Sequence, residues 1–242
     1  QEGSYVMKFE MTKRAAWSFF RAPELEEKGI LHGFCTGGVS SNLLHERTRQ
    51  DFLGAFSLKD LVVMNQEHGS DLYAISGGQI PRSGDGLIIL ERNVAGIIKT
   101  ADCLPIILCD TDYPMASIIH AGWRGTIKGI TGKAVSMMEQ LGSAKEDMVA
   151  LLGPSIGPCC YEVKEDVYSR FIKDGFPENI FHAKRDSLFL DLKQANAWML
   201  RTSGVSRVYD LNMCTYCNNE LFYSFRRGDS GNRQINFVSL NG

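Results

Sequence analysis

The sequence predicts an α+β fold with mixed β-sheets flanked by helices, and three observations point to this class. Short aliphatic runs cluster along the chain and do not alternate strictly with helices, which is typical of α+β proteins. Two longer segments repeat apolar residues at the helical period. No low-complexity linker, internal repeat or charge block divides the chain. We therefore expect residues 7–242 to form one domain, with residues 1–6 a remnant ahead of Met7.

The expected elements follow from the position of these runs. Thr126 to Leu141 and Leu188 to Ser203 carry helical apolar spacing, and each is followed by a glycine that favours helix termination. Strands are expected where β-branched and aliphatic residues lie between turn residues. The expected strands are 61–65, 71–75, 87–90, 94–99, 104–109, 115–119, 148–152, 206–209, 222–225 and 234–238.

Composition excludes several functional classes. The chain is 44% apolar and 22% charged, as globular proteins are, and its apolar runs are too short to cross a bilayer. A formal net charge of −2 gives no basic face for nucleic acid. Seven cysteines cannot all pair internally, and no export signal is visible, so we expect reduced thiols and a cytoplasmic location. Five histidines without any His-Xaa-His pair cannot build the copper cluster of a blue multicopper oxidase.

Two strands around residues 111–112 suggest a juxtaposition with chemical meaning. If 104–109 and 115–119 form a hairpin around a two-residue turn, Cys103 lies directly opposite His120, with β-carbons about 5 Å apart. A thiolate beside an imidazolium is a nucleophile. A thiolate and an imidazole are also two ligands of a zinc site, and His68, at the end of a strand, is the candidate third. The plain alternative is a buried cysteine acting as a small hydrophobe beside a capped histidine.

Five ordered motifs identify a known family. They are Gln66-Glu67-His68-Gly69, Thr100-Ala101-Asp102-Cys103-Leu104-Pro105, His120-Ala121-Gly122-Trp123-Arg124-Gly125, Gly153-Pro154-Ser155-Ile156-Gly157-Pro158-Cys159-Cys160-Tyr161-Glu162, and Cys214-Thr215 with Phe222-Tyr223-Ser224-Phe225-Arg226-Arg227. From about residue 17 onward, the chain resembles the bacterial YlmD/YfiH-like proteins, once called polyphenol oxidase or laccase-domain proteins, which include the catalytic part of mammalian FAMIN.

This resemblance implies a fold, a metal and an activity. The fold would be similar to YfiH and to the cytotoxic-necrotizing-factor deamidases. His68, Cys103 and His120 would be catalytic residues that hold Zn²⁺, with copper less expected. The activity would be a phosphorylase acting on purine nucleosides (adenosine, inosine, guanosine and methylthioadenosine) with phosphate, accompanied by adenosine deamination. Neither nucleic acid nor a membrane would be a partner, and the chain would be a monomer or a homodimer.

The resemblance weakens around one loop. The family's Asn is matched by Asn42, but the loop after it is short here. The family's Arg is best matched by Arg49, with Arg47 as the competing choice, so Asn42 and Arg49 are the expected substrate-binding residues. The planar guanidinium of Arg49 would bind phosphate. Asp102, beside the cysteine ligand, would orient a neighbouring group or a water.

Two further readings remain open for the same residues. Cys103 and His120 could form the dyad of a metal-free hydrolase or deamidase, in which His68 would have no role. The chain could also be a non-catalytic zinc-binding module. Elsewhere, Cys214-Xaa-Xaa-Cys217 is half of a zinc ribbon, and Cys159-Cys160 could supply two more ligands. Because no second Cys-Xaa-Xaa-Cys exists, the sequence does not predict a structural site there.

Overall fold

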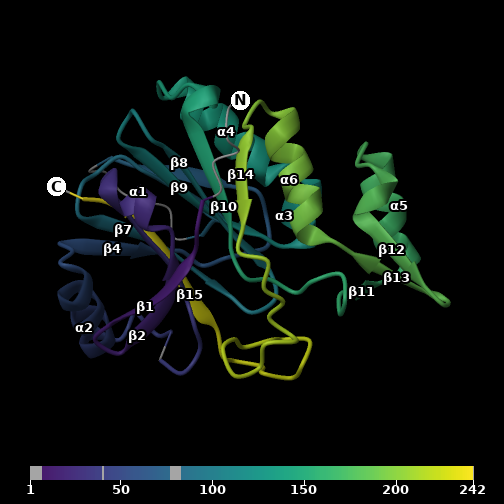
Figure 1. Cartoon of the computed structure of the whole chain (residues 1–242), viewed down its shortest axis with the longest axis horizontal. Coiled ribbons are helices and arrows are strands. Elements are labelled where there is room, and N and C mark those ends of the chain that lie inside the picture. Colours follow the sequence, from purple (N-terminus) through teal and green to yellow (C-terminus); the bar gives the residue numbers. More distant parts are fainter. Residues whose placement is uncertain (1–6, 40, 77–82, 242) are drawn as a thin grey trace.

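Two six-stranded mixed sheets stack face to face in the computed structural model, which describes residues 7–39, 41–76 and 83–241 (Figure 1). The first has the order β1-β2-β3-β15-β7-β4 and the second β14-β10-β8-β9-β6-β5. A third sheet, β11-β13-β12, lies beside α5. Each large sheet is mainly antiparallel with parallel pairing at an edge, β4 with β7 in the first and β5 with β6 and β10 with β14 in the second. The α+β class with mixed sheets and flanking helices is thus confirmed.

The elements have the following bounds. The strands are β1 Glu10–Arg14, β2 Trp17–Arg21, β3 Ile30–Cys35, β4 Asp60–Val63, β5 Leu72–Ile75, β6 Gly86–Ile89, β7 Val94–Thr100, β8 Leu104–Asp110, β9 Met115–Ala121, β10 Met148–Leu152, β11 Glu162–Val163, β12 Phe181–Lys184, β13 Ser187–Leu190, β14 Arg207–Asp210 and β15 Gln234–Leu240. The α-helices are α1 Pro23–Glu27, α2 Glu46–Phe56, α3 Trp123–Ile127, α4 Ile130–Gln140, α5 Glu165–Lys173 and α6 Leu192–Thr202, with short 3-10 turns at Lys145–Asp147 and Glu178–Ile180.

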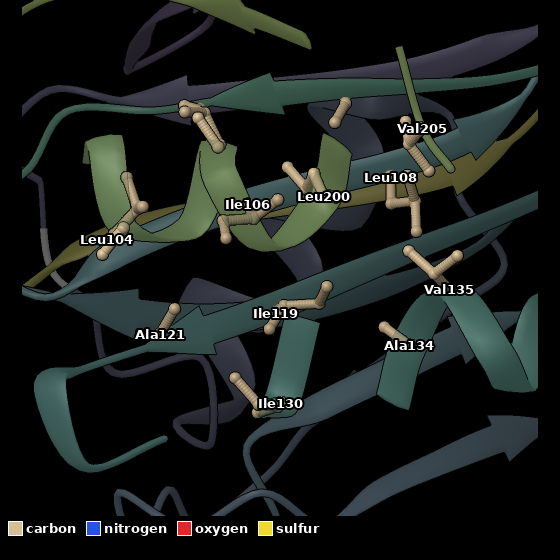
Figure 2. Close-up of a cluster of buried hydrophobic side chains, with 14 of the residues drawn as sticks. Leu104, Ile106, Leu108, Ile119, Ala121, Ile130, Ala134, Val135, Leu200 and Val205 are labelled. Atoms are coloured by element: carbon tan, nitrogen blue, oxygen red, sulfur yellow. The ribbon is translucent and has the colours of Figure 1, made fainter. Parts of the chain in front are cut away.

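Both faces of the central strands are buried, which explains why their sequences are continuous apolar runs. Along β8, Ile107 points between the two sheets, whereas Ile106 and Leu108 point to the opposite face. Figure 2 shows that face covered by α4 and α6, with Ile130 and Leu200 among the packed side chains. On the outer face of the first sheet, α2 contributes Phe52 and Phe56 to a separate aromatic cluster. The result is four layers in the order helix, sheet, sheet, helices.

Several predicted elements need correction. The predicted helix over 126–141 is two helices, α3 and α4, because Gly129 adopts a left-handed backbone with φ 75° between them. The helix predicted over 188–203 begins only at Leu192, since Asp191 caps it by accepting the backbone N–H of Gln194 at 2.9 Å. The residues before Asp191 belong to β13 instead.

The predicted strand over 222–225 is wrong. The first three backbone N–H groups of this segment bond outside any sheet ladder. Phe222 donates to the Asn218 carbonyl at 3.0 Å, Tyr223 donates to Gln234 Oε1 at 3.1 Å, and Ser224 donates to Asp229 Oδ2 at 2.9 Å. The sequence has the aromatic residues of a strand, but these side-chain acceptors hold it as a loop. The elements predicted over 61–65, 71–75, 87–90, 94–99, 148–152, 206–209 and 234–238 are present, with ends shifted by up to two residues.

The hairpin of β8 and β9 has a different register from the one predicted. Residues 111–114 form a four-residue connection and Asp110 pairs with Met115, so His120 lies opposite Pro105. Cys103 is therefore offset from His120 by two residues, which keeps both on the same face because side chains alternate with period two. The prediction that the thiol and the imidazole share one face thus holds despite the wrong turn length. They are diagonal neighbours and not directly opposed.

None of the helices in the described part of the chain combines the length and apolar character needed to cross a membrane. Residues 1–6, which the sequence predicts to be a remnant, lie outside the described residues.

Candidate metal and substrate site

Three candidate ligands converge near the ends of strands from both large sheets. His68 follows β4 of the first sheet, Cys103 immediately precedes β8, and His120 lies near the end of β9. Their ligand atoms (one ring nitrogen from each histidine and Cys103 Sγ) all lie within 4.8 Å of one another. The two imidazole rings meet edge to face, with centroids 4.8 Å apart. The structure thus brings together the three residues predicted from the sequence, while their chemical roles stay predictions.

Asp85 organises both histidines, a role that the sequence did not predict. Its Oδ1 lies 2.8 Å from His120 Nδ1 and accepts the backbone N–H of His68 at 2.9 Å. Its Oδ2 accepts the backbone N–H of Gly69 at 2.7 Å and of Glu67 at 3.3 Å. A buried carboxylate that accepts the Nδ1–H of a histidine leaves Nε2 free to bind a metal, an arrangement common in zinc proteins. The only signal in the sequence was an aspartate in Ser83-Gly84-Asp85-Gly86, which reads as an ordinary turn.

The backbone has a positive φ at His68 and at the residue before Cys103. His68 has φ 57°, and Asp102, directly before Cys103, has φ 86°. Such angles are uncommon for residues with a side chain and persist where surrounding contacts enforce them. At His68 the Asp85 carboxylate supplies these contacts through the two adjacent N–H groups, His68 and Gly69.

The charges of the site are mutually dependent. Burial by itself would raise the pKa of the Cys103 thiol, but the charge and hydrogen bonding of His120, and then of His68, lower that pKa to about 6. Burial by itself would lower the pKa of His120, but the Cys103 thiolate and the Asp85 carboxylate raise it to about 9. Burial opposes ionisation of Asp85 as well, yet the hydrogen bond from His120 and those from the backbone hold its pKa below the usual value. The site therefore favours a thiolate, the metal-binding form of cysteine.

The absence of a side chain at Gly122 provides the space in which Cys103 and His68 approach each other. Gly122 lies across from Cys103 just beyond β9, and a β-carbon at this position would be 3.1 Å from Cys103 Sγ and 3.3 Å from His68 Cδ2. Any side chain here would push against two candidate ligands at once. Its backbone has an ordinary φ of −76°, so the requirement for glycine is one of space and not of conformation.

A cavity of about 640 Å³ opens over the three candidate ligands. This size is within the range of small-molecule sites. Its wall carries cationic and aromatic side chains from distant parts of the chain. The cationic ones are Lys99, Arg124, Arg226 and Arg233, and the aromatic ones are Trp123, Tyr161 and Phe225. Three guanidinium groups lie near rings of the same wall. Arg124 Cζ is 4.4 Å from the Trp123 ring centroid, Arg226 Cζ is 5.4 Å from that of Tyr161, and Arg233 Cζ is 5.9 Å from that of Phe225.

Asp102 holds in place the part of the cavity wall formed by the 214–227 loop. Its carboxylate accepts hydrogen bonds from Thr215 Oγ1 at 2.6 Å, Ser224 Oγ at 3.0 Å and the backbone N–H of Arg226 at 2.8 Å. Thus the residue predicted to orient a neighbouring group or water holds the 214–227 loop against the loop that carries Cys103. Both carboxylate oxygens are engaged with protein donors.

Asn42 and Arg49 are not among the described residues that line this cavity. Arg49 is on α2, where it forms an ion pair with Asp60 and donates to the Leu61 carbonyl at 3.2 Å. Asn42 is exposed in the preceding loop. The structure does not place these two residues at the cavity, and their role in substrate binding stays a prediction. The cavity wall instead contains Arg124 and Arg226, which belong to the His120–Gly125 and Phe222–Arg227 motifs.

Comparison with known proteins gives a consistent family. Residues 35–241 match the family model described as "Multi-copper polyphenol oxidoreductase laccase". The chain is 33% identical over 225 residues to "Purine nucleoside phosphorylase YlmD" of Geobacillus stearothermophilus, covering 85% of this chain and 81% of that protein. It is 29% identical over 241 residues to mouse "Purine nucleoside phosphorylase LACC1", covering 87% of this chain but only 56% of the mouse protein. The chain thus spans little more than half of that relative.

Solved structures agree with the observed fold. The crystal structure of the Bacillus licheniformis hypothetical protein YfiH superposes with a TM-score of 0.84 at 25% identity, covering 96% of this chain and 99% of that chain. YlmD from Geobacillus stearothermophilus superposes with a TM-score of 0.83 at 27% identity, covering 98% and 100%. The stacked mixed sheets are therefore the fold of these proteins as well.

Proposed function

Because this chain belongs to the family described as multi-copper polyphenol oxidoreductase laccase, and because its relatives bear the name purine nucleoside phosphorylase, we propose that it is a purine nucleoside phosphorylase. The observation that carries the proposal is the convergence of His68, Cys103 and His120 beneath a cavity with cationic and aromatic walls. The proposed substrates are phosphate and adenosine, inosine, guanosine or methylthioadenosine.

The donor set suits zinc. Two imidazole nitrogens and one thiolate are ligands that zinc prefers, and three protein ligands leave one position for a substrate or water, as in catalytic zinc sites. Asp85 supports the choice, since it holds His120 with Nε2 available. When bound, zinc would supply a Lewis acid at the floor of the cavity.

The chain's own residues would divide the remaining work. In phosphorolysis a phosphate oxygen forms a bond to the ribose anomeric carbon, the glycosidic C–N bond breaks, and the purine leaves with the electron pair and takes up a proton. Arg124 and Arg226 would bind the phosphate and neutralise its charge, because a guanidinium presents its donors in the geometry that phosphate accepts. The rings of Tyr161 and Phe225 would stack on the purine and hold the nucleoside in line.

The test is product analysis with a matched cysteine variant. Inosine incubated with phosphate should give hypoxanthine and ribose 1-phosphate, with no base released when phosphate is omitted. Cys103→Ala should lower this turnover by roughly 100-fold or more because it removes a ligand and the thiolate charge. Cys109→Ala is the control, since Cys109 is buried on β8 away from the cavity, with its Sγ 3.7 Å from the Val149 carbonyl oxygen. Turnover in Cys103→Ala equal to that of the unmodified protein, without any loss of zinc, would refute the proposal.

One observation favours a second candidate. The lowered pKa of Cys103, close to 6 beside His120, is also what a metal-free hydrolase or deamidase would need for its nucleophile. In a dyad, His68 would only help to lower the pKa of Cys103, whereas a zinc site requires it as a ligand. Metal removal separates the two readings, because the dyad enzyme would keep its activity without metal and the phosphorylase would lose it. Ammonia release from adenosine in the same assay would detect the accompanying deamination.

A further inference from the structure

Four cysteines outside the candidate active site meet at one point between two loops. Cys159 and Cys160 lie in the loop after β10, and Cys214 and Cys217 lie in the loop after β14. Their four sulfur atoms all lie within 4.8 Å of one another, although more than fifty residues separate the pairs. The sequence did not predict a site here, because only one Cys-Xaa-Xaa-Cys is present. The fold nevertheless supplies the two ligands that a second such motif would provide.

The spacing of these sulfurs fits a shared metal ion better than disulfides. Cys217 Sγ lies 3.6 Å from Cys159 Sγ and 3.4 Å from Cys160 Sγ. A disulfide bond is about 2.05 Å long. Four thiolates bound tetrahedrally to zinc at about 2.3 Å are about 3.8 Å from one another. The observed distances approach this value. A shared metal ion places one sulfur at similar distances from two others, as here, whereas a disulfide would bring it close to only one.

The backbone around the cluster is built to hold the sulfurs at this place. The two loops pair through an isolated bridge between Ser155 and Cys214, and the Gly157 N–H donates to Cys214 Sγ at 3.3 Å. A β-carbon at Gly157 would lie 3.3 Å from Cys159 Sγ and 3.4 Å from Cys214 Cβ, so a glycine lets the two loops approach. An N–H group directed at sulfur stabilises a thiolate.

Two lysines lie close to the loops that carry the cluster. Lys184 Nζ donates to the carbonyl of Pro158 at 3.2 Å, and Lys193 Nζ donates to the carbonyl of Met213 at 3.3 Å. Each carbonyl immediately precedes one of the cysteine pairs. Four thiolates around a divalent ion carry a net charge of −2, which the ammonium group of Lys184 would partly offset. The charge of Lys193 is already paired with Asp210 at 2.9 Å, so this lysine mainly fixes the loop.

We propose that Cys159, Cys160, Cys214 and Cys217 bind a structural zinc ion, separate from the three-ligand site. Four thiolates fill a tetrahedral shell and leave no position for substrate, which is the pattern of structural and not catalytic zinc. The ion would join the two loops that flank the cavity. Ile156 and Tyr161 line the cavity from the first loop and Phe225 and Arg226 from the second, so the ion would fix these walls relative to each other.

The experiment measures zinc in the full chain, purified with reductant and without chelator. The unmodified protein should contain about two zinc ions per chain, and Cys217→Ser and Cys103→Ala about one each. In Cys103→Ala, zinc X-ray absorption should show four sulfur neighbours at about 2.3 Å. Asn219→Ser, an exposed change two residues after Cys217, is the control and should retain both ions.

Several results would overturn the proposal. These are an unchanged zinc content in folded Cys217→Ser, nitrogen neighbours or no zinc in Cys103→Ala, iron in place of zinc, and a disulfide among the four cysteines in the intact mass. If Cys217→Ser fails to accumulate, the zinc content and sulfur shell of Cys103→Ala alone decide. Because these readouts are independent of turnover, the structural zinc can be refuted while the phosphorylase proposal stands, and the reverse.

Discussion

Replacing Asp85 with asparagine tests whether this one carboxylate holds the candidate metal site together. Asp85→Asn keeps the shape of the side chain but removes its charge and turns one oxygen into a donor. The carboxylate is 1% exposed and accepts from His120 Nδ1 and from the backbone N–H groups of three consecutive residues, Glu67, His68 and Gly69. Each oxygen serves two donors.

The magnitude follows from this arrangement. Whichever way the amide is oriented, its NH₂ group faces two N–H donors and two hydrogen bonds to a charged acceptor are lost. At about 1.5–3 kcal/mol each, the free energy of unfolding should fall by roughly 3–6 kcal/mol. Zinc affinity should fall by about 10–100-fold, as for other residues that orient a histidine ligand.

Two assays separate the effects. Urea unfolding of metal-stripped protein measures the loss of stability without a contribution from metal. Zinc titration of the stripped protein, followed by recovery of nucleoside turnover, measures affinity at the three-ligand site. Asp71→Asn, an exposed carboxylate at the start of the neighbouring strand, makes the same chemical change and should alter unfolding by less than about 0.5 kcal/mol. If Asp85→Asn behaved like Asp71→Asn in both assays, our account of the site would be refuted.

Three further predictions concern other parts of the fold. Burial lowers the pKa of His32 to about 4, so the contribution of the neutral ring to stability is fully present above pH 6.5. As pH falls from 6.5 to 4, the free energy of unfolding should fall by roughly 3 kcal/mol. Urea unfolding at several pH values should show a smaller fall for His32→Gln, and an equal fall would contradict the prediction. Gly122→Ala should lower the rate of phosphorolysis about 10-fold or more, because the new β-carbon would press against Cys103 Sγ. The midpoint of thermal unfolding should change little, and an unaltered kcat would contradict the prediction. Gly33→Ala should destabilise the chain by about 1–3 kcal/mol in urea, since its β-carbon would lie 2.5 Å from the Phe237 ring; a stability equal to wild type would mean that the ring moves freely.

The β8–β9 hairpin shows how far local pattern carries. The apolar runs located both strands, and residue alternation put Cys103 and His120 on one face although the predicted turn was two residues too short. A period-two pattern tolerates an error of two residues and not of one. The segment 126–141 shows where local pattern fails. Its apolar spacing predicted one continuous helix, but the left-handed backbone of Gly129 divides the segment into two. The first three strands were not predicted at all, although Phe19 and Phe34 are fully buried in them.

The sequence by itself determined the fold class, most central strands and the three residues His68, Cys103 and His120, because these depend on periodicity and on motifs contained in short segments. Tertiary structure alone decided which distant groups share a site. It directed Asp85 to His120, Asp102 to the 214–227 loop, and two cysteine pairs to one point. The physical reason is that hydrogen bonds and metal ligation require groups to approach within about 4 Å. The stacking of the two sheets decides which groups come that close, and their separation along the chain does not.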